Sequence, residues 1–162
     1  MAIQMKIEGL AELSEMIAKL GEDAGKTAAG GLYEGAAVMA GEIKKGAEGI
    51  LTAPFAYAGG GKTRMPSPEE KDAVLSAGIG IAKFDRNGSE VNTSVGYNGA
   101  GYVDTAYGKR KAIAQIANAI NSGTSFMKKQ PFVRKAANAG AAKAGAAITK
   151  YIEAKFNAVT KK

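Results

Sequence analysis

The segment Gly59-Gly60-Gly61-Lys62-Thr63 comes nearest to a phosphate-binding loop. Such a loop reads Gly-x-x-x-x-Gly-Lys-Ser/Thr and lies between a buried strand and a helix, so that backbone N–H groups and the helix N-terminus meet the phosphates. Here Ala56 stands at the position of the first glycine, and two nearby prolines exclude a helix that begins at Thr63. We therefore predict a flexible loop over about residues 52–66 that contains Gly59, Gly60, Gly61 and Lys62.

Two pairs of adjacent carboxylates could also do chemistry, Glu22-Asp23 and Glu69-Glu70. Glycosidases use such pairs as general acid and base. Neither pair adjoins a predicted cleft, and Glu69-Glu70 suits the first turn of a helix, where the helix dipole stabilises acidic residues. The segment Asp85-Arg86-Asn87-Gly88 resembles the start of a calcium loop but lacks the bidentate glutamate that completes one. We interpret all these residues as structural.

Neither histidine nor cysteine occurs in the 162 residues. Their absence excludes Ser-His and Cys-His nucleophile systems, histidine-bound metals and a disulfide framework. We therefore expect no enzymatic activity, no catalytic residues, no metal and no cofactor.

The net charge of +7 is unevenly distributed along the chain. Residues 1–108 hold 10 basic and 14 acidic side chains, whereas residues 109–162 hold 12 basic side chains and one acid, Glu153. The split indicates a two-sided molecule that faces an acidic partner or stacks head to tail. A solvated basic face explains the same split about equally well. The basic clusters could also contact DNA phosphates, although no sequence-reading DNA motif accompanies them. The residues predicted for such contacts are Lys109, Arg110 and Lys111.

The composition suits one domain, residues 1–162, built on small side chains. Alanine and glycine are abundant, aromatic residues make up 7% and tryptophan is absent. Such chains pack helices closely but bury little hydrophobic surface per residue, so we expect neighbouring subunits to contribute stability. No signal peptide and no membrane-spanning run is recognisable, which predicts a soluble protein of intracellular origin with no membrane partner.

Hydrophobic periodicity predicts three elements before the middle of the chain. One short amphipathic helix is expected over about residues 10–20 and an Ala-rich helix over about 27–47, with Leu32, Ala36, Met39 and Ile43 on one side. Ser67-Pro68-Glu69-Glu70 reads as the capped start of a third helix, which ends near Gly78. These helices would pack against the strands that follow.

The second half of the chain is predicted to contain a hairpin and two more helices. Alternation over residues 79–97 favours a hairpin with its turn at Asp85-Arg86-Asn87-Gly88, and a short third strand is expected at residues 102–104. A helix from about Ile113 ends at Gly123, and Pro131 at position N1 starts the last helix. The apolar stripe of that helix is Phe132, Ala136, Ala139, Ala147, Ile148, Tyr151, Ile152, Phe156 and Val159. The predicted class is α+β, with a small antiparallel sheet packed by N-terminal helices and a long C-terminal helix.

Several segments in this order resemble one known family. The chain is similar to the tail-component (head–tail joining, or tail-completion) family of long-tailed bacteriophages at three places. These are residues 7–13, with Gly-Leu before the first helix, the Ala53-Pro54 helix exit, and above all Gly123-Thr124-Ser125 followed by Gln130-Pro131-Phe132-Val133-Arg134. Lys135 stands where the family often has a second proline, and the loop before the hairpin lacks its usual Thr-Gly-x-Leu form.

The resemblance implies a non-enzymatic virion protein made in the host bacterial cytoplasm. It would form a homo-oligomeric ring, commonly sixfold, in the neck between the capsid connector and the tail tube, and would often be monomeric before assembly. In such a ring the acidic part of one subunit could meet the basic part of the next, or the cations could line a lumen that DNA traverses. The alternative is a small basic protein that binds DNA without sequence specificity. The residues assigned to assembly are Gly123, Thr124, Ser125, Lys128, Lys129, Pro131, Phe132 and Arg134.

Overall fold

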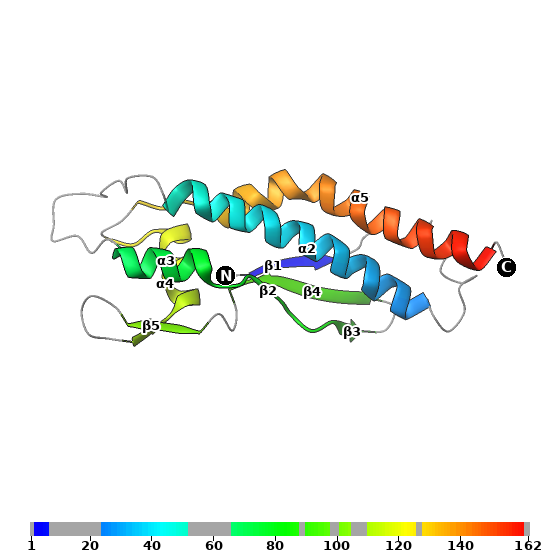
Figure 1. Cartoon of the computed structure of the whole chain (residues 1–162), viewed down its shortest axis with the longest axis horizontal. Coiled ribbons are helices and arrows are strands. Elements are labelled where there is room, and N and C mark those ends of the chain that lie inside the picture. The colour runs from blue at the N-terminus through cyan, green and yellow to red at the C-terminus, as the bar shows by residue number, and fades with distance from the viewer. Residues whose placement is uncertain are drawn as a thin grey trace.

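The structure, a computed structural model, is an elongated α+β molecule in which two long helices lie along one face of a small sheet (Figure 1). Further short elements gather at one end of the helix pair. The predicted fold class is thereby confirmed. The structure describes residues 2–6, 24–51, 66–87, 90–97, 101–104, 110–125 and 128–160.

The two long helices are α2 (Ala24–Leu51) and α5 (Phe132–Thr160), and they run antiparallel side by side. Their 28 and 29 residues correspond to about 42 Å of helix each. The predicted stripe of α2 is confirmed, because Leu32, Ala36, Met39 and Ile43 are all buried. The stripe predicted for α5 is wrong at Ala139, which is exposed, and it missed Ala144, which is buried.

Glycines allow the two helices to approach closely. A Cβ atom on Gly35 of α2 would lie 2.7 Å from two atoms of the Ile148 side chain on α5 and 3.2 Å from the carbonyl oxygen of Ala144. Gly30 makes room for the Tyr151 ring in the same way. Glycine therefore lowers the intrinsic stability of α2 but creates the contact surface that α5 needs.

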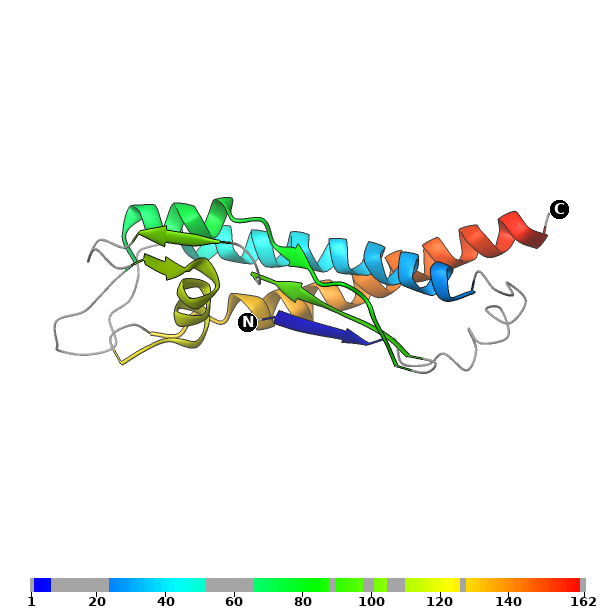
Figure 2. The same cartoon turned by 90° about the horizontal axis from the view of Figure 1, so that it is seen from below.

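The sheet is antiparallel and centres on β4 (Glu90–Gly96), with β1 (Ala2–Lys6) on one side and β2 (Gly80–Ile81) and β3 (Asp85–Asn87) on the other. Alternate residues along and just beyond β4, Thr93, Val95 and Tyr97, are buried, and α2 contacts this strand. Helices therefore cover one face of the sheet (Figure 2).

A bulge separates β2 from β3. Ile81 pairs with Val95, but Asp85 pairs with Asn92, so three residues oppose two on β4. Ala82 N donates to Ser94 O (2.8 Å), and the Thr93 hydroxyl donates to Ala82 O (2.8 Å), so both backbone groups of the first bulge residue have partners. The hairpin prediction is confirmed, but its turn was placed too early: residues 85–87 are strand, and the connection at 88–89 lies outside the described residues.

The end of the molecule carries α3 (Pro68–Ser76), α4 (Ile113–Ser122) and a two-stranded ribbon of β5 (Tyr102–Asp104) and β6 (Arg110–Ala112). The capping box of α3 is confirmed, with Glu70 N donating to Ser67 Oγ (3.2 Å) and Ser67 N to Glu70 Oε2 (3.0 Å). The predicted strand at 102–104 exists, but it pairs with β6 rather than with the main sheet. The helix predicted near residues 10–20 and the loop at 52–65 lie outside the described residues.

Replacing Gly35 by alanine should test the close helix contact. The new methyl group would overlap Ile148 and press on the Ala144 carbonyl, which cannot rotate away. We expect the free energy of unfolding to fall by about 1–3 kcal/mol, which outweighs the helix-propensity gain of roughly 1 kcal/mol. The matched control is Gly41→Ala on the same helix, where nothing lies within 4 Å, and which should raise stability by up to about 1 kcal/mol. Urea unfolding followed by circular dichroism measures both, and equal stabilisation of the two variants would contradict the packing.

Candidate assembly surface

The segment that carries the family resemblance forms a sharp corner between α4 and α5. Gly123, at a φ of 79°, ends α4, and its N–H donates to Ala119 O (2.9 Å), as predicted for a C-terminal glycine. The chain then returns to the same helix end, where Gln130 N donates to Ile120 O (3.0 Å). Pro131 lies one position earlier than predicted: it is the N-cap residue of α5, and its carbonyl accepts from Lys135 N (3.2 Å).

A buried asparagine fixes the direction of α5. Asn121, on α4, is 5% exposed, and its Oδ1 accepts a hydrogen bond from Val133 N at 3.1 Å. A helix begins with backbone N–H groups that have no partner inside the helix, and proline at the N-cap has no side-chain acceptor to offer. The cap is instead supplied by the preceding helix. Sequence reasoning missed Asn121, although it lies four residues after Ala117, on the predicted apolar stripe of α4.

Phe132 anchors the corner in the hydrophobic core. Its side chain is 1% exposed and meets the ring of Tyr97, also 1% exposed, edge to face with 6.2 Å between centroids. Gly46 of α2 faces the Phe132 backbone, where a Cβ atom would come 3.3 Å from its carbonyl oxygen. Phe132 therefore supports the surface from below within this chain, and its assignment to an assembly interface stays a prediction.

Four cations project from this buried base: Lys128, Lys129, Arg134 and Lys135. All four are exposed, and the structure gives none of them an ion pair with a described residue. The sequence contains no acidic residue between Asp104 and Glu153 that could neutralise them locally. We call this group the cationic corner. Thr124 and Ser125, also assigned to assembly, are exposed beside it.

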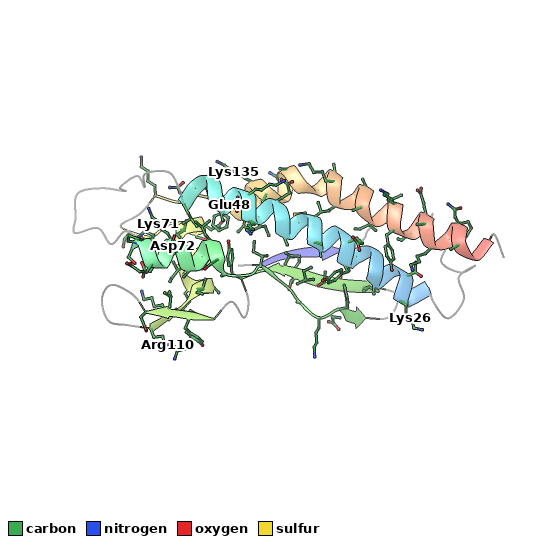
Figure 3. All side chains as sticks on the ribbon, viewed as in Figure 1. Lys26, Glu48, Lys71, Asp72, Arg110 and Lys135 are labelled. Atoms are coloured by element: carbon green, nitrogen blue, oxygen red, sulfur yellow. The ribbon has the colours of Figure 1, made fainter. Side chains whose placement is uncertain are left out.

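The second predicted basic cluster is only partly a free surface. Arg110 is exposed on the ribbon, but its guanidinium lies 5.1 Å from the centroid of the Tyr102 ring, and its paired position on β5 is Asp104. Lys111 is half-buried, and Lys109 lies outside the described residues. Tyr102 is 64% exposed, one of two large hydrophobic side chains so exposed in the described part of the chain. Figure 3 marks Arg110 on the ribbon and Lys135 on α5, on different sides of this end.

Part of the charge asymmetry is neutralised inside the molecule. Lys143 of α5 reaches across to Glu42 of α2, with 2.9 Å between Nζ and Oε1, and Lys45 lies 3.6 Å from the same oxygen. The hydrogen bond from Lys143 lowers the pKa of Glu42 below its usual value. The basic and acidic parts of the chain therefore touch along the helix pair, while the cationic corner keeps its charge.

Within the described ranges, no three acidic side chains group so as to hold a metal ion. A hollow of about 60 Å³ on the sheet is lined by Gly80, Ile81, Ala82, Ser94 and Gly96, which include no acid, no base and no metal ligand. None of the described helices is long and apolar enough to cross a bilayer. The glycine-rich residues Gly59, Gly60, Gly61 and Lys62 lie outside the described residues.

Comparison with known proteins returned no match: no family model, no curated protein and no solved structure resembles the chain closely enough. The likeness to the tail-completion family therefore stays a prediction from the sequence motifs.

Removing the Asn121 cap should destabilise the corner. Asn121→Ala leaves the buried Val133 N–H without its acceptor, which should cost about 1–3 kcal/mol of the free energy of unfolding. Asn118→Ala, an exposed site on the same helix, should change it by less than about 0.5 kcal/mol. Urea unfolding compares them, and equal effects would show that the cap contributes nothing.

Tyr97 should make the protein less stable at high pH. Burial raises its pKa to about 12, whereas the unfolded chain ionises near pH 10. The stability that this buried, protonated hydroxyl contributes is complete below pH 10. It is lost as the pH rises to about 12, because the tyrosine of the unfolded chain releases its proton first. The loss is on the order of 2–3 kcal/mol. The free energy of unfolding, measured from pH 9 to 12, should fall more in the wild type than in Tyr97→Phe. The variant is the control because lysine deprotonation lowers the stability of both proteins equally. Parallel pH profiles would contradict the buried hydroxyl.

Proposed function

We propose that this protein is a structural virion component of a long-tailed bacteriophage, a tail-completion subunit that forms a ring between the capsid connector and the tail tube. It would be made in the host cytoplasm and act without a cofactor and without catalysis. Its partners would be further copies of itself, the connector and the tail tube.

The observation that carries the proposal is the construction of the corner over the described residues 120–125 and 128–135. Within and beside the family-like segment, Phe132 is buried and the buried Asn121 accepts from Val133 N, whereas the four lysines and arginines of the cationic corner are exposed and have no ion pair with a described residue. A charged surface whose described residues rest on buried contacts presents those charges in one orientation, which lowers the entropic cost of binding. Such a surface serves assembly well.

The composition supports the same function. The sequence lacks histidine and cysteine, and the described residues contain no group of three acidic side chains that could hold a metal ion. The small residues that line the α2–α5 contact leave a thin core for so long a molecule, and contacts between subunits would add to it.

The alternative of non-specific DNA binding draws on the same four cations. A protein that neutralises phosphates loses affinity steeply with salt, in proportion to the contacts it makes. Binding to random duplex DNA at physiological ionic strength, abolished by Lys128→Glu with Lys129→Glu, would favour this alternative. Absence of such binding favours assembly.

Deletion of the gene from the phage genome tests the proposal. We expect lysates in which DNA-filled heads and finished tails accumulate separately, as seen by electron microscopy, because the joining ring is missing. Complementation from a plasmid should restore joined, infectious particles, and Gly41→Ala serves as a neutral control allele. Normal joined virions from the deletion strain would refute the function.

A further inference from the structure

The end of the molecule that holds α3, α4 and the ribbon has two different sides. In Figure 2, α3 and the segment that leads into α5 lie on opposite sides of this end. The helix α4 contacts α3 and connects through the corner to α5. The cationic corner therefore occupies one side, and α3 occupies the other.

The side formed by α3 is acidic. Glu69 and Asp72 are three residues apart, hence on one face of α3, and both are exposed. Glu69 accepts a hydrogen bond from the Ser67 hydroxyl at 2.7 Å, which lowers its pKa and keeps it ionised. Lys71, between them in the sequence, contributes one opposing charge. We call Glu69 and Asp72 the acidic flank.

An exposed aromatic ring adjoins the acidic flank. The strand β5 contacts α3, and its Tyr102 presents most of its surface to solvent. Arg110 and Asp104 on the same ribbon carry opposite charges at paired positions and so offset one another. Tyrosine and arginine are prominent among the residues that dominate the energetics of protein interfaces. The Arg110 guanidinium already lies 5.1 Å from the centroid of the Tyr102 ring, so a partner would contact the remaining exposed surface of the ring. The ring thus offers an anchor beside a negatively charged surface.

We propose that the occupant of the acidic flank is the cationic corner of a second copy of this chain. Four exposed cations would meet the two exposed carboxylates and the Tyr102 ring. The inference rests on the proposed function, in which copies form a ring, and it names the two surfaces that would touch.

The placement of the two surfaces dictates a head-to-tail contact. A symmetric dimer through the corner would set four cations against four cations, which repulsion disfavours. Opposite sides of one end allow each copy to use its corner toward one neighbour and its flank toward the other. Contacts of this heterologous kind repeat, and they close into a ring when the rotation permits.

Charge reversal tests the contact. In sedimentation at low salt, the wild type should self-associate as concentration rises, and salt should weaken the association. Lys128→Glu with Lys129→Glu, or Glu69→Lys with Asp72→Lys, should weaken it at least tenfold. A mixture of the two double variants should associate again, because the unchanged acidic flank of the first can meet the unchanged cationic corner of the second. Circular dichroism confirms that the variants fold, and Asp72→Lys alone replaces the second pair if the cap of α3 suffers.

The matched control is Lys150→Glu compared with Lys129→Glu. Both change one exposed lysine, but Lys150 lies toward the other end of α5. Only Lys129→Glu should weaken association. Equal effects, no rescue in the mixture, or a wild type that stays monomeric at low salt and high concentration would overturn the contact. So would a Lys129→Glu variant that loses DNA binding but associates normally.

A disulfide trap gives a second measurement, because the chain has no cysteine of its own. A chain with Lys129→Cys mixed with a chain with Asp72→Cys should form a mixed dimer under mild oxidation. Glu34→Cys, at an exposed position on α2, is the control and should cross-link at least tenfold more slowly. Equal rates would contradict the contact. If deletion of the gene prevents head–tail joining while charge reversal leaves ring formation intact, this contact is wrong and the proposed function stands. If the copies associate through this contact but deletion of the gene causes no joining defect, the contact stands and the proposed function is wrong.

Discussion

The close approach of α2 and α5 is the contact on which the rest of the structure depends. Ile148 and Tyr151 of α5 pack where Gly35 and Gly30 of α2 have no side chain, so the two helix backbones come nearer than larger residues would allow. The remaining core continues from this pair: buried residues of α2 also face β4 through Val95 and Tyr97. Glycine is costly inside a helix, and here the cost is offset by packing over most of the length of α5.

The helix pair determines where the corner lies. Because α5 is held along α2, its first turn is fixed, and Gly46 of α2 leaves space for the backbone at Phe132. Asn121 then joins the end of α4 to the start of α5 by one buried hydrogen bond. These buried contacts determine where the exposed cations lie, so the geometry of the proposed assembly surface depends on residues that no partner would touch.

The fold also redistributes the charge of the chain. The acidic first part and the basic last part are brought into contact along the helix pair, where Glu42 and Lys143 neutralise each other. At the end of the molecule, α3 and the segment that leads into α5 lie on opposite sides (Figure 2). A charge excess along a sequence therefore produces a charged surface only where the fold places no oppositely charged side chains beside it.

The sequence by itself determined the elements whose signals are local. Periodicity predicted α2, the stripe of α4 and the hairpin, and the capping box and Gly123 predicted the start of α3 and the end of α4, because caps and apolar faces depend on neighbours within a few residues. Only the tertiary structure decided the rest. The hydrogen bond between Asn121 and Val133 joins residues twelve positions apart. The bulge makes Asp85–Asn87 a strand instead of a turn, and β5 pairs with β6 instead of with the main sheet. Ala139 and Ala144 have the same side chain, and which of them is buried follows from the rotation at which α5 meets α2. Such outcomes depend on contacts between segments far apart in the chain, which no local pattern specifies.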